Sequence, residues 1–359
     1  MGSEMCIRDS PMRATLRPVL RAFTVLAASV LASTAQARME PMEDSELATV
    51  TGQANFNLTT DSHDGLEFTR LNFGLDVATQ LNIKKLQLGL YGRTGEVANT
   101  ADIDMDNFAL GSVNDATGQI NPFNIKNPFI ELAYNGNKVV GIRLGFGEAQ
   151  GHLSGDIKTV TGNIPIDVYG KGSYLASKIT CGWDFITCLP AKGLVGSVYA
   201  NSDFSAPAQL ITATGEPDPV RAAKIGIKDG TSLSIPAGSG FDNFLLGIFK
   251  SQDCNLLGVK TCFGLDTFKT FPIGKFDTAT QQFDPAGAAK GVFLSMQTQD
   301  LKWRDQQDKL NFVTALAGAF LNLPRDVDGK AVVTASFEQA LNGIPRIDTC
   351  LGTAAPGGC

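Results

Sequence analysis

The sequence is poor in the residues that most often carry catalytic chemistry. Its 359 residues include only two histidines, His63 and His152, and a triad-type serine or cysteine nucleophile needs a histidine as its base. No GxSxG motif is present, so the usual sign of an α/β-hydrolase nucleophile is missing. Gly170-Lys171 and Gly274-Lys275 lack the other residues of a phosphate-binding loop. We therefore predict no catalytic residue and no cofactor.

The spacings typical of metal sites are missing as well. The chain has no CxxC or HxxxH pair, and such close ligand pairs are usual in zinc sites. Asp102, Asp104 and Asp106 resemble the opening of a calcium-binding loop. However, Asn107 stands where glycine is required and Val113 where the bidentate glutamate belongs. We predict no metal site, and strand alternation places these three carboxylates together on a solvated face.

Basic residues do not cluster anywhere in the chain. Lysine and arginine total 30 against 36 aspartates and glutamates, which gives a net charge of −6. Nucleic-acid binding relies on groups of basic side chains that neutralise phosphates. We expect no nucleic-acid partner, and the oligomeric state stays open.

An apolar run near the N-terminus is too short to cross a bilayer. It covers residues 22–32, whereas a spanning helix needs roughly 20 apolar residues. Arg13, Arg17 and Arg21 precede the run and Ala35-Gln36-Ala37 follows it, which completes the three parts of a secretory signal. We predict a signal peptide over residues 12–37, cleaved after Ala37, and export to the periplasm, the outer membrane or the medium. Residues 1–11 lie upstream of it, and MGSEMCIRDS at their start resembles a translated sequencing adapter.

Six cysteines remain in the predicted mature domain, residues 38–359. Six cysteines allow 15 pairings in principle, but these lie in three close pairs along the chain. An exported chain with such pairs is expected to form local disulfides. The predicted bridges are Cys181–Cys188, Cys254–Cys262 and Cys350–Cys359.

The stretch from Asn127 to Tyr169 has the clearest β pattern. Asn135-Gly136-Asn137 separates two strand-like runs, and Asn-Gly at this place is a strong hairpin signal. We expect an antiparallel meander of at least four strands here. In its second strand we expect an apolar face, buried against protein or a hydrophobic ligand, formed by Val140, Ile142, Leu144 and Phe146. The opposite face, with Arg143 and three glycines, is then expected to be solvent-exposed.

The rest of the chain adds further strands and short helices. A partly disordered leader or a short helix is expected within residues 39–54. The loop 202–240, rich in proline, glycine and serine, is either an elaborate connection or a boundary between two lobes. Apolar residues at helical spacing favour a helix over 305–323, with a bent strand as the competitor. Ser336 and Gln339 predict a capping box that opens a helix over 336–343.

Three segments resemble a group of uncharacterised exported proteins of Gram-negative bacteria. The first is MEDSELATVTGQA, the second runs from NPFIELAYNGNKVV to GHLSGDI, and the third combines FLSMQTQDLKW, GAFLNLP and IPRIDTCLG. The resemblance implies export and a β-rich fold. The group has no assigned activity or site, so no residue acquires a role from it.

These observations predict a mainly β protein: an antiparallel meander, large twisted sheet or sandwich with one or two short C-terminal helices. The leading functional hypothesis is a non-enzymatic cell-envelope protein, either structural or binding a hydrophobic ligand or an envelope protein. An outer-membrane β-barrel is the alternative, since barrels use alternating strands. Few tyrosines (5) and tryptophans (2) stand against it. A hydrolase that uses a pair of carboxylates is the third hypothesis.

Overall fold

The computed structural model describes residues 56–114, 116–182, 185–234, 249–277, 280–326 and 328–350. The described residues together form one compact unit. The predicted signal peptide, the leader over 39–54 and Cys359 therefore lie outside the described residues.

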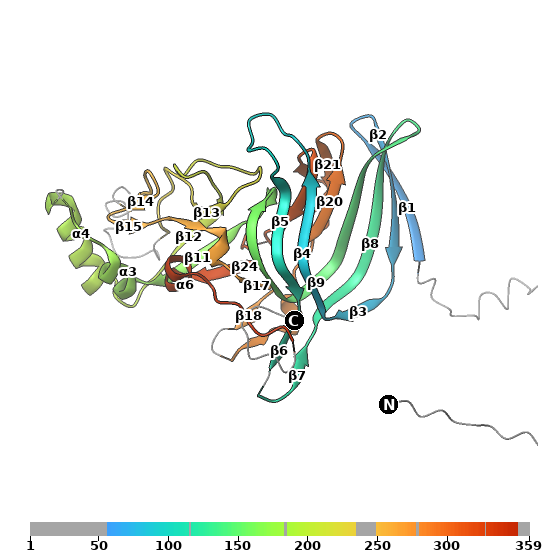
Figure 1. Ribbon diagram of the computed structural model, residues 1–359. Helices are drawn as coiled ribbons and strands as arrows, with labels where there is room; N and C mark the ends of the chain where they lie inside the picture. Colours follow the sequence, from blue (N-terminus) through green and yellow to red (C-terminus); the bar gives the residue numbers. More distant parts are fainter. Residues whose placement is uncertain are drawn as a thin grey trace, which may run out of the picture. The chain divides into compact units, whose positions relative to one another are not determined.

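The predicted β-rich class is confirmed, and an 11-stranded sheet dominates the fold (Figure 1). Its main path runs β1-β2-β8-β9-β20-β23-β10, with β3, β4, β5 and β17 attached beside it. The bounds along the path are β1 Phe56–His63, β2 Leu66–Phe73, β8 Phe123–Asn135, β9 Lys138–Val160, β20 Phe293–Gln297, β23 Gly318–Asn322 and β10 Gly162–Asn163. The attached strands are β3 Asp76–Thr79, β4 Leu81–Leu90, β5 Ala101–Leu110 and β17 Thr270–Ile273.

The predicted hairpin is present, but the strand that follows it is longer than expected. β8 and β9 pair from Asn135↔Lys138 outward, and Gly136 in the turn between them has a φ of +57°. β9 then continues for 23 residues without a break, longer than a single strand of the expected meander. Its first half pairs with β8 and β20, and its second half pairs with β5 and β17. The predicted four-strand meander is therefore replaced by one hairpin with a long shared strand.

A second sheet of five strands follows the order β16-β13-β12-β11-β24. Its strands are β11 Ile166–Lys171, β12 Asp203–Leu210, β13 Lys224–Ile227, β16 Cys262–Gly264 and β24 Val333–Ser336. In the described part of the chain, three helices accompany it, α3 Gly172–Lys178, α4 Phe185–Ser197 and α6 Phe337–Asn342. Residues 203–227, inside the loop that the sequence left as a connection or a boundary, thus supply two strands of this sheet. Every helix in the described ranges is too short or too polar to span a bilayer.

Short two-stranded ribbons and turns complete the described structure. The ribbons are β6 Ser112–Asn114 with β7 Gln119–Asn121, β14 Asn255–Leu256 with β15 Val259–Lys260, β18 Phe276–Asp277 with β19 Gln282–Phe283, and β21 Leu301–Arg304 with β22 Phe312–Ala315. Two 3₁₀ turns cover Leu265–Thr267 and Pro285–Gly287.

The C-terminal helix predictions have opposite outcomes. The helix over 336–343 is confirmed as α6, and both hydrogen bonds of the Ser336/Gln339 capping box form. The helix over 305–323 is wrong, because these residues form the strands β22 and β23. Pairing of β22 with β21 and of β23 with β20 outweighs the weak preference expressed by helical spacing.

Two hydrophobic cores hold the elements together. The larger core joins the second half of β9, β5, the five-stranded sheet and α3, α4 and α6. The smaller core lies between the first half of the large sheet and the ribbon β21–β22, and Trp303, Phe68, Phe293 and Phe320 are among its members.

Candidate functional site

Three of the four predicted apolar residues of β9, Ile142, Leu144 and Phe146, share one face of the large sheet. The fourth, Val140, lies beside a register shift and packs against the smaller core. Leu144 lies beside Ile130 of β8 and Leu294 of β20. On one side, Ile130 lies opposite Leu71 of β2, which lies opposite Leu58 of β1. On the other side, Leu294 lies opposite Leu321 of β23. One row of aliphatic side chains therefore crosses the sheet from its β1 edge to β23, since residues directly opposite one another on paired strands lie on the same face.

The prediction that this face is buried is wrong for its middle part. Leu144 is 39% exposed, Ile130 36%, Leu58 64% and Met296 42%. Val140, Ile142 and Phe146 are half-buried. We call this surface the open face, and it consists of Leu58, Leu71, Ile130, Ile142, Leu144 and Met296.

The covered face of β9 is the opposite one, which was predicted to be solvent-exposed. Arg143 is completely buried and Glu131 is 5% exposed. The Arg143 Nε donates to Glu131 Oε2 at 2.7 Å and its Nη1 donates to the Arg304 carbonyl at 2.9 Å. The guanidinium carbon also lies 5.0 Å from the centroid of the Trp303 ring. The assignment of the two faces is therefore reversed, while the alternation itself is correct.

Glycines on the covered face explain the wrong assignment. A Cβ built on Gly145 would lie 2.1 Å from the Phe129 ring, and one on Gly141 would lie 2.4 Å from Leu301. These glycines leave room for large side chains that reach across the sheet from neighbouring elements, an arrangement known for aromatic rings over strand glycines. In the sequence they look like an empty polar surface.

The open face ends in a groove beside β4. The groove has a volume of about 560 Å³ and lies between Gly89 and Tyr91, Val139–Ile142, Met296–Thr298 and Ala317–Ala319. None of these lining residues carries a charge. Beyond Leu294 and Leu321 the same face merges with the larger core. The open face is thus an apolar surface that is closed at one end and open to solvent at the other.

The other histidine and acidic residues considered in the sequence make contacts that stabilise the fold. His63 Nε2 lies 2.7 Å from the Lys302 carbonyl oxygen, and its ring stacks on Phe68 at 4.1 Å. Asp104 and Asp106 form ion pairs with Lys85 at the surface, as their predicted solvated face requires. No group of three or more histidine, cysteine or acidic side chains in the described ranges is placed to hold a metal ion.

Asp102 departs from the solvated face predicted for it, because it is completely buried. Its Oδ1 accepts hydrogen bonds from Arg221 Nε at 2.9 Å and Arg93 Nη1 at 3.3 Å. Its Oδ2 accepts from the Ala319 backbone N–H at 2.9 Å. The carboxylate therefore joins β5, β23 and the Arg221 segment, and sequence analysis missed it because Arg221 lies far along the chain.

His152 is largely buried, and its Nδ1 lies 3.3 Å from the Ser112 Oγ. Its ring lies 5.0 Å from Phe276 and 4.9 Å from Phe283. Burial disfavours the charged imidazolium and lowers the pKa of His152 to about 4.

We expect the stability of the protein to fall as the pH drops from about 6.5 to about 4. In this window the unfolded chain binds a proton at His152 and the folded chain does not, so protonation favours unfolding. The expected loss approaches about 3 kcal/mol below pH 4. Urea unfolding at several pH values measures it, and His152→Gln should lack this part of the slope. An unchanged slope in the variant would assign the pH dependence to other groups.

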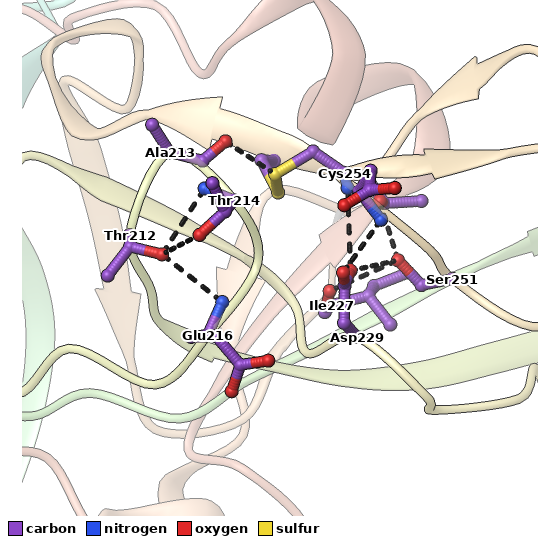
Figure 2. Close-up of a disulfide and its surroundings, with 11 residues drawn as sticks. Thr212, Ala213, Thr214, Glu216, Ile227, Asp229, Ser251 and Cys254 are labelled. Carbon is purple, nitrogen blue, oxygen red and sulfur yellow. Dashed lines mark hydrogen bonds between the residues drawn. A yellow bond between two sulfur atoms is a disulfide. The ribbon is translucent and has the colours of Figure 1, made fainter.

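Two predicted disulfides are confirmed. Cys181 and Cys188 are bonded with a Cα–Cα distance of 5.6 Å, and Cys254 and Cys262 with 5.1 Å. Asp229 holds the second bridge in place, since its carboxylate accepts hydrogen bonds from the backbone N–H groups of Asp253 and Cys254 (Figure 2). Cys350 is buried, and its pairing with Cys359 stays a prediction. Disulfides indicate an oxidising environment outside the cytoplasm.

Comparison with known proteins gives no further assignment. No protein-family model, curated protein or solved structure matches the chain.

Proposed function

We propose that this protein is a non-enzymatic, exported component of the cell envelope that binds a ligand with a long aliphatic chain on the open face. The observation that carries the proposal is the row from Leu58 to Leu321, which is aliphatic at every strand that it crosses. Monomeric proteins rarely leave a continuous apolar patch of more than a few hundred Å² uncovered.

The dimensions of the open face suit an extended chain. The open face reaches from Leu58 on β1 to Met296 on β20, and at the usual spacing of about 4.8 Å between strands it is about 19 Å long. That length is comparable with a long acyl group. The groove of about 560 Å³ at its end falls within the range of about 300–1,000 Å³ that is typical of small-molecule sites.

The chemistry of the groove favours an aliphatic ligand over a polar one. Tyr91, Gln297 and Thr298 are the polar residues of its lining, and they lie at the end near β4 and the start of β23. A ligand with one polar end and an aliphatic tail would place its polar end here and its tail along Ile142, Leu144 and Ile130. The predicted signal peptide, the resemblance to exported Gram-negative proteins and the disulfides support a place in the envelope.

Replacing Ile130 and Leu144 together by asparagine tests this function. The double variant should bind a fluorescent long-chain fatty acid about tenfold more weakly, because two aliphatic contacts are lost at about 1 kcal/mol or less each. Leu310→Asn is the control, since Leu310 is 86% exposed on the β21–β22 ribbon, on the covered side of the sheet. Native mass spectrometry of the protein purified from its exporting host identifies any ligand that it already carries.

Equal affinity in the double variant and the control would contradict the proposal. So would the absence of fatty-acid binding in the wild-type protein after delipidation. Thermal unfolding of all three proteins must show that the variants are folded before their affinities are compared.

A further inference from the structure

One polar side chain in the lining of the groove has a buried atom without a hydrogen-bond partner. Gln297 of β20 lines the groove and is only 6% exposed. Its Nε2 donates to the Leu316 carbonyl, which fixes the orientation of the amide. Its Oε1 is buried and accepts no hydrogen bond from the described part of the chain. A buried acceptor without a donor is costly, so a ligand that donates a hydrogen bond to this oxygen gains more than one that does not.

Glycines on both neighbouring strands leave space beside Gln297. It lies directly opposite Gly141 of β9 and Gly318 of β23, and both glycines line the groove. Residues directly opposite on paired strands share a face. A Cβ on Gly318 would lie 2.6 Å from the Tyr91 Oη. The polar end of the groove therefore has the Gln297 amide on β20 and the Tyr91 hydroxyl beside the adjacent strand.

The charged groups near this end of the groove balance one another. Asp102 accepts hydrogen bonds from Arg93 and Arg221. Asp300 accepts one from the Ala317 N–H at 2.7 Å. Two arginines thus stand against two aspartates. The Arg93 Nη1 is also held by the Ala317 carbonyl, to which it donates at 3.1 Å, so the cation nearest the groove is already engaged by the protein.

This arrangement suits a hydroxyl group better than a carboxylate. A carboxylate has only acceptor atoms, and it would bring a second acceptor to the unpartnered Gln297 Oε1. It would also lose its hydration without gaining a free cation, and burying an unpaired charge costs more than burying a hydrogen-bonded hydroxyl. A hydroxyl donates its proton to the Gln297 Oε1 and keeps two lone pairs for other donors.

We infer that the groove selects long-chain ligands whose polar end is an uncharged hydroxyl group, and that the Gln297 Oε1 is the acceptor that selects them. The inference rests on the proposed binding of an aliphatic chain by the open face and adds the chemistry of the polar end. Long-chain alcohols belong to this class. Ionised fatty acids bind through their tails alone, and therefore more weakly.

Displacement of a bound fluorescent fatty acid tests the inference on the purified protein. Tetradecan-1-ol and tetradecanoate are compared at pH 8, where the carboxyl group is ionised. The two ligands have tails of the same length, so their affinities differ only through the polar end. The wild-type protein should bind the alcohol about tenfold more tightly, as expected for one hydrogen bond to a buried acceptor.

Gln297→Met removes the acceptor and keeps the length of the side chain. Its affinity for the alcohol should fall about tenfold while its affinity for the fatty acid does not fall, so the preference disappears. Gln299→Met is the matched control, because Gln299 is an exposed glutamine that lies outside the groove lining. This control should keep the wild-type preference. Thermal unfolding of both variants shows that they are folded.

Three results would overturn the inference while the proposed function stands. The wild-type protein binds the two ligands equally, or its preference for the alcohol persists in Gln297→Met. The third is tighter binding of the fatty acid that is lost in Arg93→Gln, since Arg93 would then bind the carboxylate. If neither ligand binds, or if the Ile130→Asn, Leu144→Asn variant binds both as the wild type does, the proposed function fails and this inference fails with it.

Discussion

Arg143→Ala should lower the free energy of unfolding by about 3–5 kcal/mol, because it leaves the Glu131 carboxylate buried without its partner. Both side chains lie on the covered face, and the Arg304 carbonyl also loses the hydrogen bond that Arg143 Nη1 donates to it. The neighbouring Leu144→Ala should cost less than about 1 kcal/mol, since substitutions at partly exposed positions have small effects. Urea unfolding of the two variants measures the difference directly.

The double variant Glu131→Leu, Arg143→Met separates the lost ion pair from lost packing. Replacing both charges by apolar groups leaves no lone buried charge, so a large part of the stability should return. If Leu144→Ala were the more costly single change, the covered and open faces of the sheet would be interchanged, and the proposed ligand site would fall with them.

Asp102→Asn is expected to be the second most damaging change, with a loss of about 3–5 kcal/mol. The substitution keeps the shape of the side chain but leaves the Arg221 guanidinium, which is 1% exposed, without a neutralising charge. It also weakens the acceptor for the Ala319 N–H, which fixes the start of β23 against β5.

Asp104→Asn is the matched control for this prediction. Asp104 lies two positions away in the same strand and on the same face, but its partner Lys85 is solvent-exposed. Surface ion pairs contribute about 0–1 kcal/mol, so this variant should unfold almost like the wild type. Equal losses of unfolding free energy in the two variants would mean that the burial of Asp102 does not increase its contribution to stability.

Local features of the fold were predictable because their determinants lie close together in the sequence. The hairpin around Gly136, the capping box at Ser336 and the two described disulfides each depend on residues within about ten positions. The helix expected over 305–323 failed even though β21, the partner of β22, is close by in the sequence. Its residues form strands that pair with β20 and β21, and the spacing of apolar residues does not show which strands will pair.

The candidate site was predictable only in part. Alternation identified which residues of β9 share a face, but it cannot tell which face other elements cover. The ribbon that covers Arg143 comes from Leu301–Ala315, far along the chain.

The length of β9 has a consequence for how the protein reaches its native state. β8 is adjacent in sequence, so the β8–β9 hairpin closes only a small loop, but β20 follows Gly145 by roughly 150 residues. Loop closure and folding rate both become less favourable as sequence separation grows. We therefore expect the hairpin to form early and β20 to join late. Until then one long edge of β9 has unpaired backbone groups, and such an edge invites pairing with other chains. The risk of aggregation during folding is consequently highest before residues 293–297 pair with β9.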